Sequence, residues 1–308
     1  MATLIVGVLN VTPDSFSDGG RFSSVQQAVA AGLAMVEEGA DWLDVGGEST
    51  RPGAVPVPEA EEIDRVVPVL RELSARLGGR ARLSVDTYKA ATARAALAAG
   101  ASVVNDVSGG LLDPEILTVA AAGGATLVLG HLRGKPSTMQ AQIHFDDVVA
   151  EVADELASRV AAARAAGCRE VWADPGIGFG KKLPHNLALL KHLTIVRERV
   201  GVPVMVGVSR KRFLGELLSL SWEPWEGSQT LPRSGSGGQS PPAPTRSSRE
   251  PREDARPLRP VGERVFGTAA AVAAAILNGA AAVRVHDVLA MRDVVRVAEA
   301  IARYDQLV

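Results

Sequence analysis

The chain has 308 residues, of which 46% are hydrophobic and 22% are charged, and its formal net charge is −2 at pH 7. This charge gives no reason to expect a nucleic acid or an anionic membrane as partner, and no apolar run is long enough to span a bilayer. Cys168 is the only cysteine, so an intrachain disulfide framework is excluded, and the first residues lack the marks of a signal peptide; we expect a cytoplasmic protein.

Short apolar strands recur along the chain. After the first strand, each is preceded by an alanine-rich helical stretch that ends in Gly or Gly-Gly, as in VEEGADWLDV and ILNGAAAVRVHD. A glycine after the last helical turn is the usual left-handed cap, because it has no Cβ to clash there. These junctions predict strands near 4–9, 42–45, 83–86, 103–106, 126–129, 171–174, 204–208 and 282–285. Helical patterns lie between them, for example over 25–38, 59–77, 89–99, 148–166 and 289–304.

Strict alternation of strand and helix eight times over predicts a parallel sheet with right-handed crossovers. The simplest such fold is a closed (β/α)₈ TIM barrel, which commonly takes about 250 residues, so we expect one α/β barrel domain over 1–308 rather than two average domains. The alternative is an open doubly wound sheet, but no dinucleotide fingerprint opens the chain.

One segment, 221–260, breaks this alternation. It is rich in Pro, Gly, Ser and Arg and has few apolar residues beyond Trp222 and Trp225. Such a composition does not bury enough apolar surface to offset the entropy of ordering the chain. We therefore predict a disordered insertion after strand 7, within the barrel domain.

Polar or charged residues follow all eight predicted strands, where barrels of this kind carry their catalytic groups. Helix capping is an alternative explanation for Asp106, Asp287 and Ser209. It does not explain the cations, because a positive charge near a helix N-terminus opposes the helix dipole, so we expect a bound anion at the barrel mouth. The polar residues at these strand ends are Asn10, Glu48, Ser49, Thr50, Arg51, Asp86, Asn105, Asp106, His131, Arg133, Asp174, Ser209, Arg210, Lys211, Arg284 and His286.

Two other patterns do not carry a function. DPGIGFGKK has closely spaced glycines, but a phosphate loop needs glycine where Pro175 stands and Ser or Thr where Lys182 stands. The histidines lack the spacing of metal ligands, and His144, His185 and His192 are interpreted as surface or capping residues.

Seven motifs fall in order at the strand ends: LNVTPDSFSDGG, DVGGESTRPGA, SVDTYK, VNDVSGG, DPGIGFGK, SRKRFLG and RVHDV. Together they resemble the dihydropteroate synthase family along essentially the whole chain outside 221–260. The resemblance implies a (β/α)₈ barrel that is usually a homodimer and depends on Mg²⁺. It also implies that the substrates are 6-hydroxymethyl-7,8-dihydropterin pyrophosphate and p-aminobenzoate, and that the products are 7,8-dihydropteroate and pyrophosphate.

The same resemblance implies roles for individual residues. The pterin-binding residues are Asp86, Asn105, Asp174 and Lys211, and of these Asp86, Asp174 and Lys211 are also expected to be catalytic. Pyrophosphate is expected to contact Arg51, Arg284 and His286, and the metal to take its protein ligand from Asn10. The residues expected around p-aminobenzoate are Thr50, Pro52 and Phe179, with Thr12, Pro13 and Phe16 on a mobile lid after strand 1. Arg212 stands where many relatives carry a serine that contacts the p-aminobenzoate carboxylate, so it is expected either to pair with that carboxylate or to point to solvent.

The residue types suit this chemistry. A buried carboxylate such as Asp174 can accept both N–H donors on the edge of a pterin. Cations and Mg²⁺ stabilise a departing pyrophosphate, and Mg²⁺ keeps most of its water, so one oxygen from Asn10 is enough. The amine of p-aminobenzoate is a neutral nucleophile, so no strong general base is required, and none is obvious.

Two alternatives share part of this pattern. The methyltetrahydrofolate-binding domain of corrinoid methyltransferases also contacts a pterin through Asp and Asn, but it has no use for a pyrophosphate site. A non-catalytic pterin-binding paralogue would be favoured if an expected polar position were lost, and in this sequence every one is filled.

Overall fold

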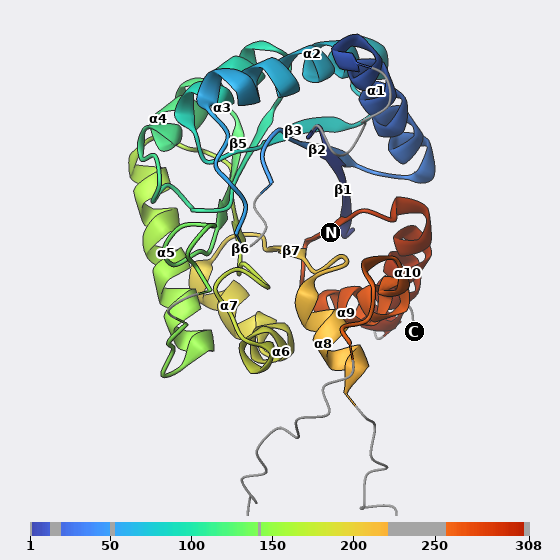
Figure 1. The fold of residues 1–308 in the computed structure, drawn as a ribbon. Coiled ribbons are helices and arrows are strands. Elements are labelled where there is room, and N and C mark those ends of the chain that lie inside the picture. Colours follow the sequence, from blue (N-terminus) through green and yellow to red (C-terminus); the bar gives the residue numbers. More distant parts are fainter. Residues whose placement is uncertain (1, 13–19, 50–52, 141–142, 221–256, 305–308) are drawn as a thin grey trace, which may run out of the picture.

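The computed structural model describes residues 2–12, 20–49, 53–140, 143–220 and 257–304, and within them eight parallel strands form a barrel (Figure 1). The strands pair in the order β6-β5-β4-β3-β2-β1-β8-β7. A parallel bridge between Ala173 and Val204, supported by the Ala173 N–H donating to the Pro203 carbonyl at 3.0 Å, joins β6 to β7 and closes the ring. The predicted barrel is confirmed. The strands are β1 Leu4–Asn10, β2 Trp42–Gly46, β3 Arg82–Asp86, β4 Val103–Asp106, β5 Thr126–Gly130, β6 Val171–Asp174, β7 Met205–Gly207 and β8 Ala282–Val285.

Helices form the outer layer of the barrel (Figure 1). Two crossovers carry two helices each, because the chain bends at His192 between α6 and α7 and passes through a short 3₁₀ turn, Val261–Glu263, before α9. None of the described helices is both long and apolar enough to cross a membrane. The helices are α1 Gly20–Glu38, α2 Glu59–Leu77, α3 Ala90–Ala98, α4 Glu115–Ala122, α5 Val148–Ala165, α6 Leu183–Lys191, α7 Leu193–Val200, α8 Arg212–Ser219, α9 Val265–Leu277 and α10 Val288–Ala302.

The amino-terminal end of the barrel interior is filled by large apolar side chains. Trp42 of β2 and Trp172 of β6 meet edge to face with ring centroids 5.2 Å apart, and both are almost fully buried. They cluster with the buried side chains Val6, Val103, Val128, Met205 and Ala282. Successive residues of a strand point to opposite faces, so Asp44, two residues after Trp42, also faces the interior. The apolar floor therefore supports a polar layer above it.

The two ends of the predicted insertion contact each other at the end of α8. Ser219, the last residue of α8, donates from Oγ to the Pro257 carbonyl at 3.0 Å and accepts from the Arg259 N–H at 2.9 Å. Residues 257–260 of the predicted segment are thus held against α8. Its remaining residues, 221–256, lie outside the described residues, so their predicted disorder stays a prediction.

Candidate active site

Asp44 is the centre of a buried polar cluster in the mouth of the barrel. Its carboxylate accepts hydrogen bonds from Ser84 Oγ at 2.5 Å, Asn105 Nδ2 at 2.8 Å and Arg284 Nε at 2.6 Å. The Nη2 atom of Arg284 donates to Asp86 Oδ2 at 2.7 Å. These contacts join β2, β3, β4 and β8, and they fix the directions of the Asn105 amide and the Arg284 guanidinium.

Burial and the neighbouring charges shift the pKa values of Asp86 and Arg284 in this cluster. Burial raises the pKa of Asp86 to about 7, because the Asp44 carboxylate adds to the cost of desolvation and Arg284 offsets only part of it. Burial disfavours the charge of Arg284, but the Asp44 and Asp86 carboxylates outweigh this effect and hold its pKa above the usual value. Arg284 is therefore a fixed cation between two carboxylates.

A second cluster gathers at the ends of β6 and β7. Asp174 is buried, and its Oδ1 accepts the Gly176 N–H at 2.7 Å. Lys211 donates from Nζ to the Ile177 carbonyl, and Nζ lies 4.3 Å from the centre of the Phe179 ring. Burial raises the pKa of Asp174 and lowers the pKa of Lys211 to about 8, although each group opposes the shift of the other.

Two glycines, Gly207 and Gly46, lie beside the polar groups of these clusters. A methyl group placed on Gly207 would lie 3.8 Å from Arg284 Cβ, 3.8 Å from Lys211 Nζ and 3.9 Å from Asp174 Oδ2. The absence of a side chain at this position leaves space beside the Asp174 carboxylate, the Lys211 amine and the base of the Arg284 side chain. On the opposite side of the mouth, a methyl group on Gly46 would lie 3.6 Å from Asp86 Oδ2 and 3.8 Å from Asn10 Oδ1. Asn10 therefore lies beside the first cluster.

The three candidate helix caps have other roles. Ser209 Oγ lies 3.0 Å from His286 Nδ1 and accepts the His286 N–H at 3.2 Å, and Asp287 accepts from Arg210 Nε at 3.0 Å. Asp287 precedes α10 but makes no capping hydrogen bond. Asp106 accepts from Ser108 and Gly110 within the turn after β4, well before α4. Capping was the wrong explanation, because each side chain binds a nearby loop instead.

The interpretation of the three set-aside histidines is confirmed. The side chain of His144 is 85% exposed, and His185 Nδ1 accepts the Lys182 N–H at 3.3 Å at the start of α6. His192 occupies the end of α6, where its N–H donates to the Ala188 carbonyl at 2.9 Å.

Comparison with known proteins agrees with this geometry. A family model described as pterin binding enzyme matches residues 6–231. A dihydropteroate synthase from Synechocystis sp. (strain ATCC 27184 / PCC 6803 / Kazusa) is 40% identical over 303 residues, which cover 98% of this chain and 91% of that protein. This chain belongs to the dihydropteroate synthase family.

Solved structures of the dihydropteroate synthase family have the same fold. The Xanthomonas albilineans enzyme with 4-aminobenzoic acid has a TM-score of 0.77 and 42% identity, and the match covers 97% of this chain and 93% of that one. The same enzyme in complex with 7,8-dihydropteroate has a TM-score of 0.74 and 39% identity, with 97% and 94% covered.

The structure brings most of the residues expected from the dihydropteroate synthase family to one mouth. Those that meet there are Asn10, Asp86, Asn105, Asp174, Phe179, Lys211 and Arg284. His286 directly follows β8, the strand that carries Arg284. Arg212 is placed apart, because it begins α8, its side chain is 75% exposed, and its Nε pairs with Glu216 Oε1 at 2.8 Å. Thr12 ends the described segment after β1. The predicted Pro13, Phe16, Thr50, Arg51 and Pro52 lie outside the described residues.

Asp44 is the residue that the sequence reasoning missed. It was counted as part of an apolar strand, and only residues at or after the strand ends were considered as candidates. A signal was present, since Asp44 opens the DVGGESTRPGA motif and shares the inner face of its strand with Trp42. A carboxylate in the middle of a buried strand needs partners, and Ser84, Asn105 and Arg284 are those partners.

Proposed function

We propose that this chain condenses 6-hydroxymethyl-7,8-dihydropterin pyrophosphate with p-aminobenzoate to give 7,8-dihydropteroate and pyrophosphate. The observation that carries this function is the single barrel mouth in which buried acceptors, on Asp174 and Asn105, lie beside the cations Lys211 and Arg284. Such a site suits a ligand with a polar heterocycle at one end and an anion at the other.

Both clusters supply groups that would bind the pterin. The Asp174 carboxylate is held by Gly176 and accepts the paired N–H donors of the pterin edge. The Asn105 amide nitrogen is committed to Asp44, so its oxygen is oriented as an acceptor. Lys211, beside Asp174, supplies a donor on the same side of the mouth.

The cations act on the leaving group. As the aniline nitrogen forms its bond to the pterin methylene carbon, the bond from that carbon to the pyrophosphate oxygen breaks and its electron pair goes to pyrophosphate. Arg284 is held rigidly by Asp44 and Asp86, so it presents positive charge without reorganising. His286, and Arg51 outside the described residues, would bind the same anion. The proton lost by the amine passes to solvent.

We expect Mg²⁺ to bind in this mouth together with the substrate. Among the described residues there is no group of three or more His, Cys, Asp or Glu side chains arranged to hold a metal. Asn10 Oδ1 and Asp86 Oδ2 nevertheless both lie beside Gly46, and Mg²⁺ favours a few protein oxygens combined with phosphate oxygens and water. Asn10 would be the protein ligand, and the bound ion would neutralise charge on the leaving pyrophosphate.

Metal removal therefore tests the activity and the cofactor together. We expect the purified protein to form dihydropteroate from the two substrates when Mg²⁺ is present and to lose this activity after exhaustive chelation, with recovery when Mg²⁺ is added back. Product is measured by chromatography. Full activity in chelated enzyme would refute the metal dependence, and the absence of product from all components would refute the function. Pterin binding without product would favour the non-catalytic paralogue.

The pKa of Lys211 predicts that activity falls at alkaline pH. Because burial lowers this pKa to about 8, Nζ is protonated below that pH and loses its charge above it. We expect kcat/KM for the pterin pyrophosphate, which reports groups of the free enzyme, to fall as pH rises through about 8. The guanidinium of Lys211→Arg does not titrate in this range, so kcat/KM of this variant should not fall as pH rises through about 8, even if its kcat/KM is lower than that of wild type. An identical fall in both proteins would assign the titration to another group.

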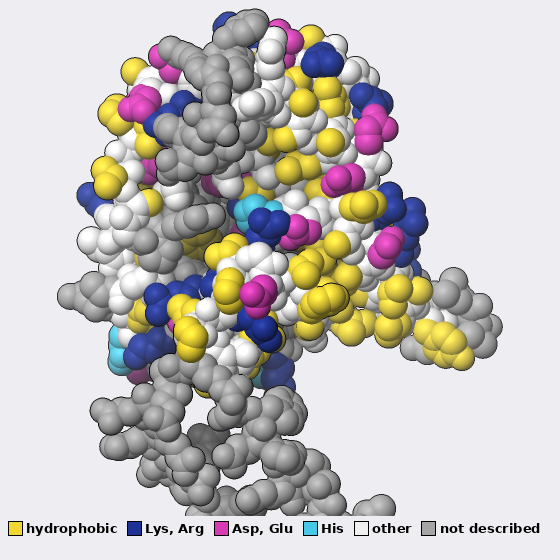
Figure 2. All heavy atoms as spheres, turned by 45° about the vertical axis from the view of Figure 1, so that its right-hand side comes forward, with side chains coloured by type: hydrophobic (Ala, Val, Ile, Leu, Met, Phe, Trp, Pro, Cys, Tyr) yellow, Lys and Arg dark blue, Asp and Glu magenta, His cyan; other side chains and the backbone are white. Residues whose placement is uncertain are grey.

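We also propose that the chain forms a homodimer through the outer surface of α9 and α10. Figure 2 brings this side forward and shows hydrophobic side chains gathered over its lower half. Leu277, Val297 and Ile301 are 49%, 62% and 60% exposed there. They belong to a shallow, mainly apolar groove whose lining is Ala273, Leu277, Asp293, Val294, Val297, Ala298 and Ile301. Contiguous exposed apolar surface of this kind is typical of an interface.

Light scattering tests the dimer. We expect a mass of twice the 32.1 kDa of one chain, and we expect Val297→Lys to shift the protein toward the monomer, because a charge would be buried in the interface. Ile195→Lys on α7, at a residue 52% exposed, is the matched control and should leave the mass unchanged. A monomeric wild type would contradict the proposal.

The cytoplasm remains our proposal for the compartment in which the chain works. Cys168 is a free, buried thiol, and burial raises its pKa. A thiol of this kind suits a reducing environment. The relative from Synechocystis supports the same assignment, since it is a bacterial dihydropteroate synthase.

A further inference from the structure

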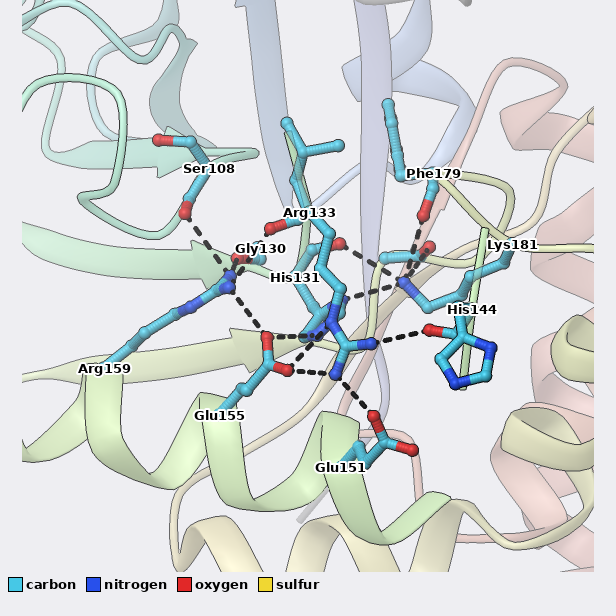
Figure 3. A network of polar contacts seen from close by, with 12 residues as sticks. Ser108, Gly130, His131, Arg133, His144, Glu151, Glu155, Arg159, Phe179 and Lys181 are labelled. Carbon is cyan, nitrogen blue, oxygen red and sulfur yellow. Dashed lines mark hydrogen bonds and ion pairs between the residues drawn. The ribbon is translucent and has the colours of Figure 1, made fainter. Parts of the chain in front are cut away.

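Lys181 is a buried cation-forming group for which the proposed reaction has no use. Its side chain lies beneath the mouth, in the network of Figure 3, and is only 4% exposed. Nζ lies 2.9 Å from His131 Nδ1, 3.1 Å from the Gly176 carbonyl, 3.1 Å from the Phe179 carbonyl and 3.4 Å from the His131 carbonyl. One amine therefore connects the end of β5 to the loop after β6.

His131 is held as an acceptor for this amine. Hydrogen bonds from His131 and Arg133 hold the pKa of Glu155 at about 2, so its carboxylate is ionised and accepts the hydrogen bond of His131 Nε2–H, 3.1 Å away. Burial, together with the nearby Lys181, lowers the pKa of His131 to about 3, so the ring is neutral. With its proton on Nε2, the ring presents a bare Nδ1 to Lys181. Arg133 Nε in turn holds Glu155 Oε1 at 2.9 Å.

The acceptors of Lys181 are the two ends of one tight turn. The Phe179 N–H donates to the Gly176 carbonyl at 3.0 Å, which closes the turn, and Lys181 binds the carbonyls of both residues. Gly176 has φ of +65°, and a methyl group there would lie 2.0 Å from the His131 carbonyl oxygen, so the turn is pressed against β5. Between these ends, the Ile177 carbonyl accepts from Lys211, and the Phe179 ring lies against the same amine.

We propose that Lys181 is a positioning residue, which fixes the Gly176–Phe179 turn and thereby sets the Phe179 ring for binding p-aminobenzoate. The amine has three N–H bonds when charged and two when neutral, and two are enough for the carbonyls of Gly176 and Phe179. Lys181 is buried, so it acts through Phe179. The proposal rests on the proposed function, because an aromatic amine must bind beside Phe179.

The test compares two neighbouring lysines. Lys181→Met keeps the length of the side chain but removes every donor, whereas Lys182→Met makes the same change at an exposed position. We expect Lys181→Met to raise KM for p-aminobenzoate about tenfold or more, while the calorimetric Kd for the pterin pyrophosphate stays within about twofold of wild type. Lys182→Met should match wild type in both. A merely structural role would lower the active fraction and leave the KM for p-aminobenzoate unchanged.

Folding is checked by the thermal unfolding midpoint. If Lys181→Met does not fold, Lys181→Gln, which keeps an NH₂ donor, is measured in the same assays, and we expect a smaller rise in the same KM. A KM for p-aminobenzoate equal to that of wild type in either folded variant would overturn the proposal. Wild-type enzyme is assayed first: no dihydropteroate from it would refute the function itself, whereas an active wild type with unaffected variants would refute only the role of Lys181.

Discussion

Asp174→Asn is expected to weaken binding of the pterin pyrophosphate by about 2–4 kcal/mol, which is roughly a 30- to 1,000-fold rise in Kd. In the wild type, Oδ1 accepts from Gly176, and Oδ2 faces the space beside Gly207 and Lys211. Asparagine can keep the bond to Gly176 with its oxygen, but it then presents NH₂ where the pterin needs an acceptor. Donors would face donors, and one charge-assisted hydrogen bond would be lost.

The stability of this variant separates the two roles of Asp174. If the residue only held the turn that begins at Pro175, asparagine would serve as well, since both residues accept from a backbone N–H two positions on. We therefore expect the unfolding free energy to change by about 1 kcal/mol or less, with p-aminobenzoate binding affected less than pterin binding. Asp146→Asn, at a side chain that is 93% exposed, is the control. Equal pterin affinities for wild type and Asp174→Asn would show that the pterin pocket lies elsewhere.

The fold was predictable because its local signals all agree. Apolar strands, glycine caps and helical stretches alternate along the chain, and every predicted strand lies within one or two residues of the observed one. The sequence does not predict that two helices lie between β6 and β7 and two between β7 and β8. The break at His192 and the short turn before α9 have no strong sequence signal. Helix α1 begins at Gly20, earlier than predicted, since apolar periodicity starts only near Val25.

The site was predictable to the extent that its residues end strands. A residue such as Asp174 is recognisable from its position, because parallel strands bring their carboxyl ends to one face of a barrel. Asp44 was missed because it lies inside a strand, and its importance depends on Ser84, Asn105 and Arg284, which are distant in sequence. For the same reason, sequence reasoning did not single out Lys181: its partners come from the end of β5 and from a turn, and only folding brings them together.

The contact between Arg284 and the two carboxylates is expected to be the most sensitive point of the barrel mouth. Asp44 is fully buried and Asp86 nearly so, and Arg284 donates to both, at 2.6 Å and 2.7 Å. Arg284→Met would leave two neighbouring carboxylates without their counter-ion. Removing one partner of a buried ion pair typically costs about 3–5 kcal/mol of unfolding free energy, and we expect a loss of this size together with loss of turnover.

The pH dependence of the Arg284→Met deficit tests its cause. Without the guanidinium, the folded-state pKa of Asp86, already raised to about 7 by burial, should rise further above its unfolded value. The folded variant then binds this proton more tightly than the folded wild type does, so its stability relative to wild type must fall as pH rises above about 7 and recover as pH falls through about 7. Arg94→Met breaks a pair with Glu115 whose side chains are 58% and 62% exposed, and it should cost at most about 1 kcal/mol at any pH. Denaturant unfolding of the three proteins on both sides of about pH 7 decides between the explanations. A deficit that did not change with pH would mean that Arg284 stabilises the mouth by packing, since only uncompensated carboxylates can regain stability by taking up protons.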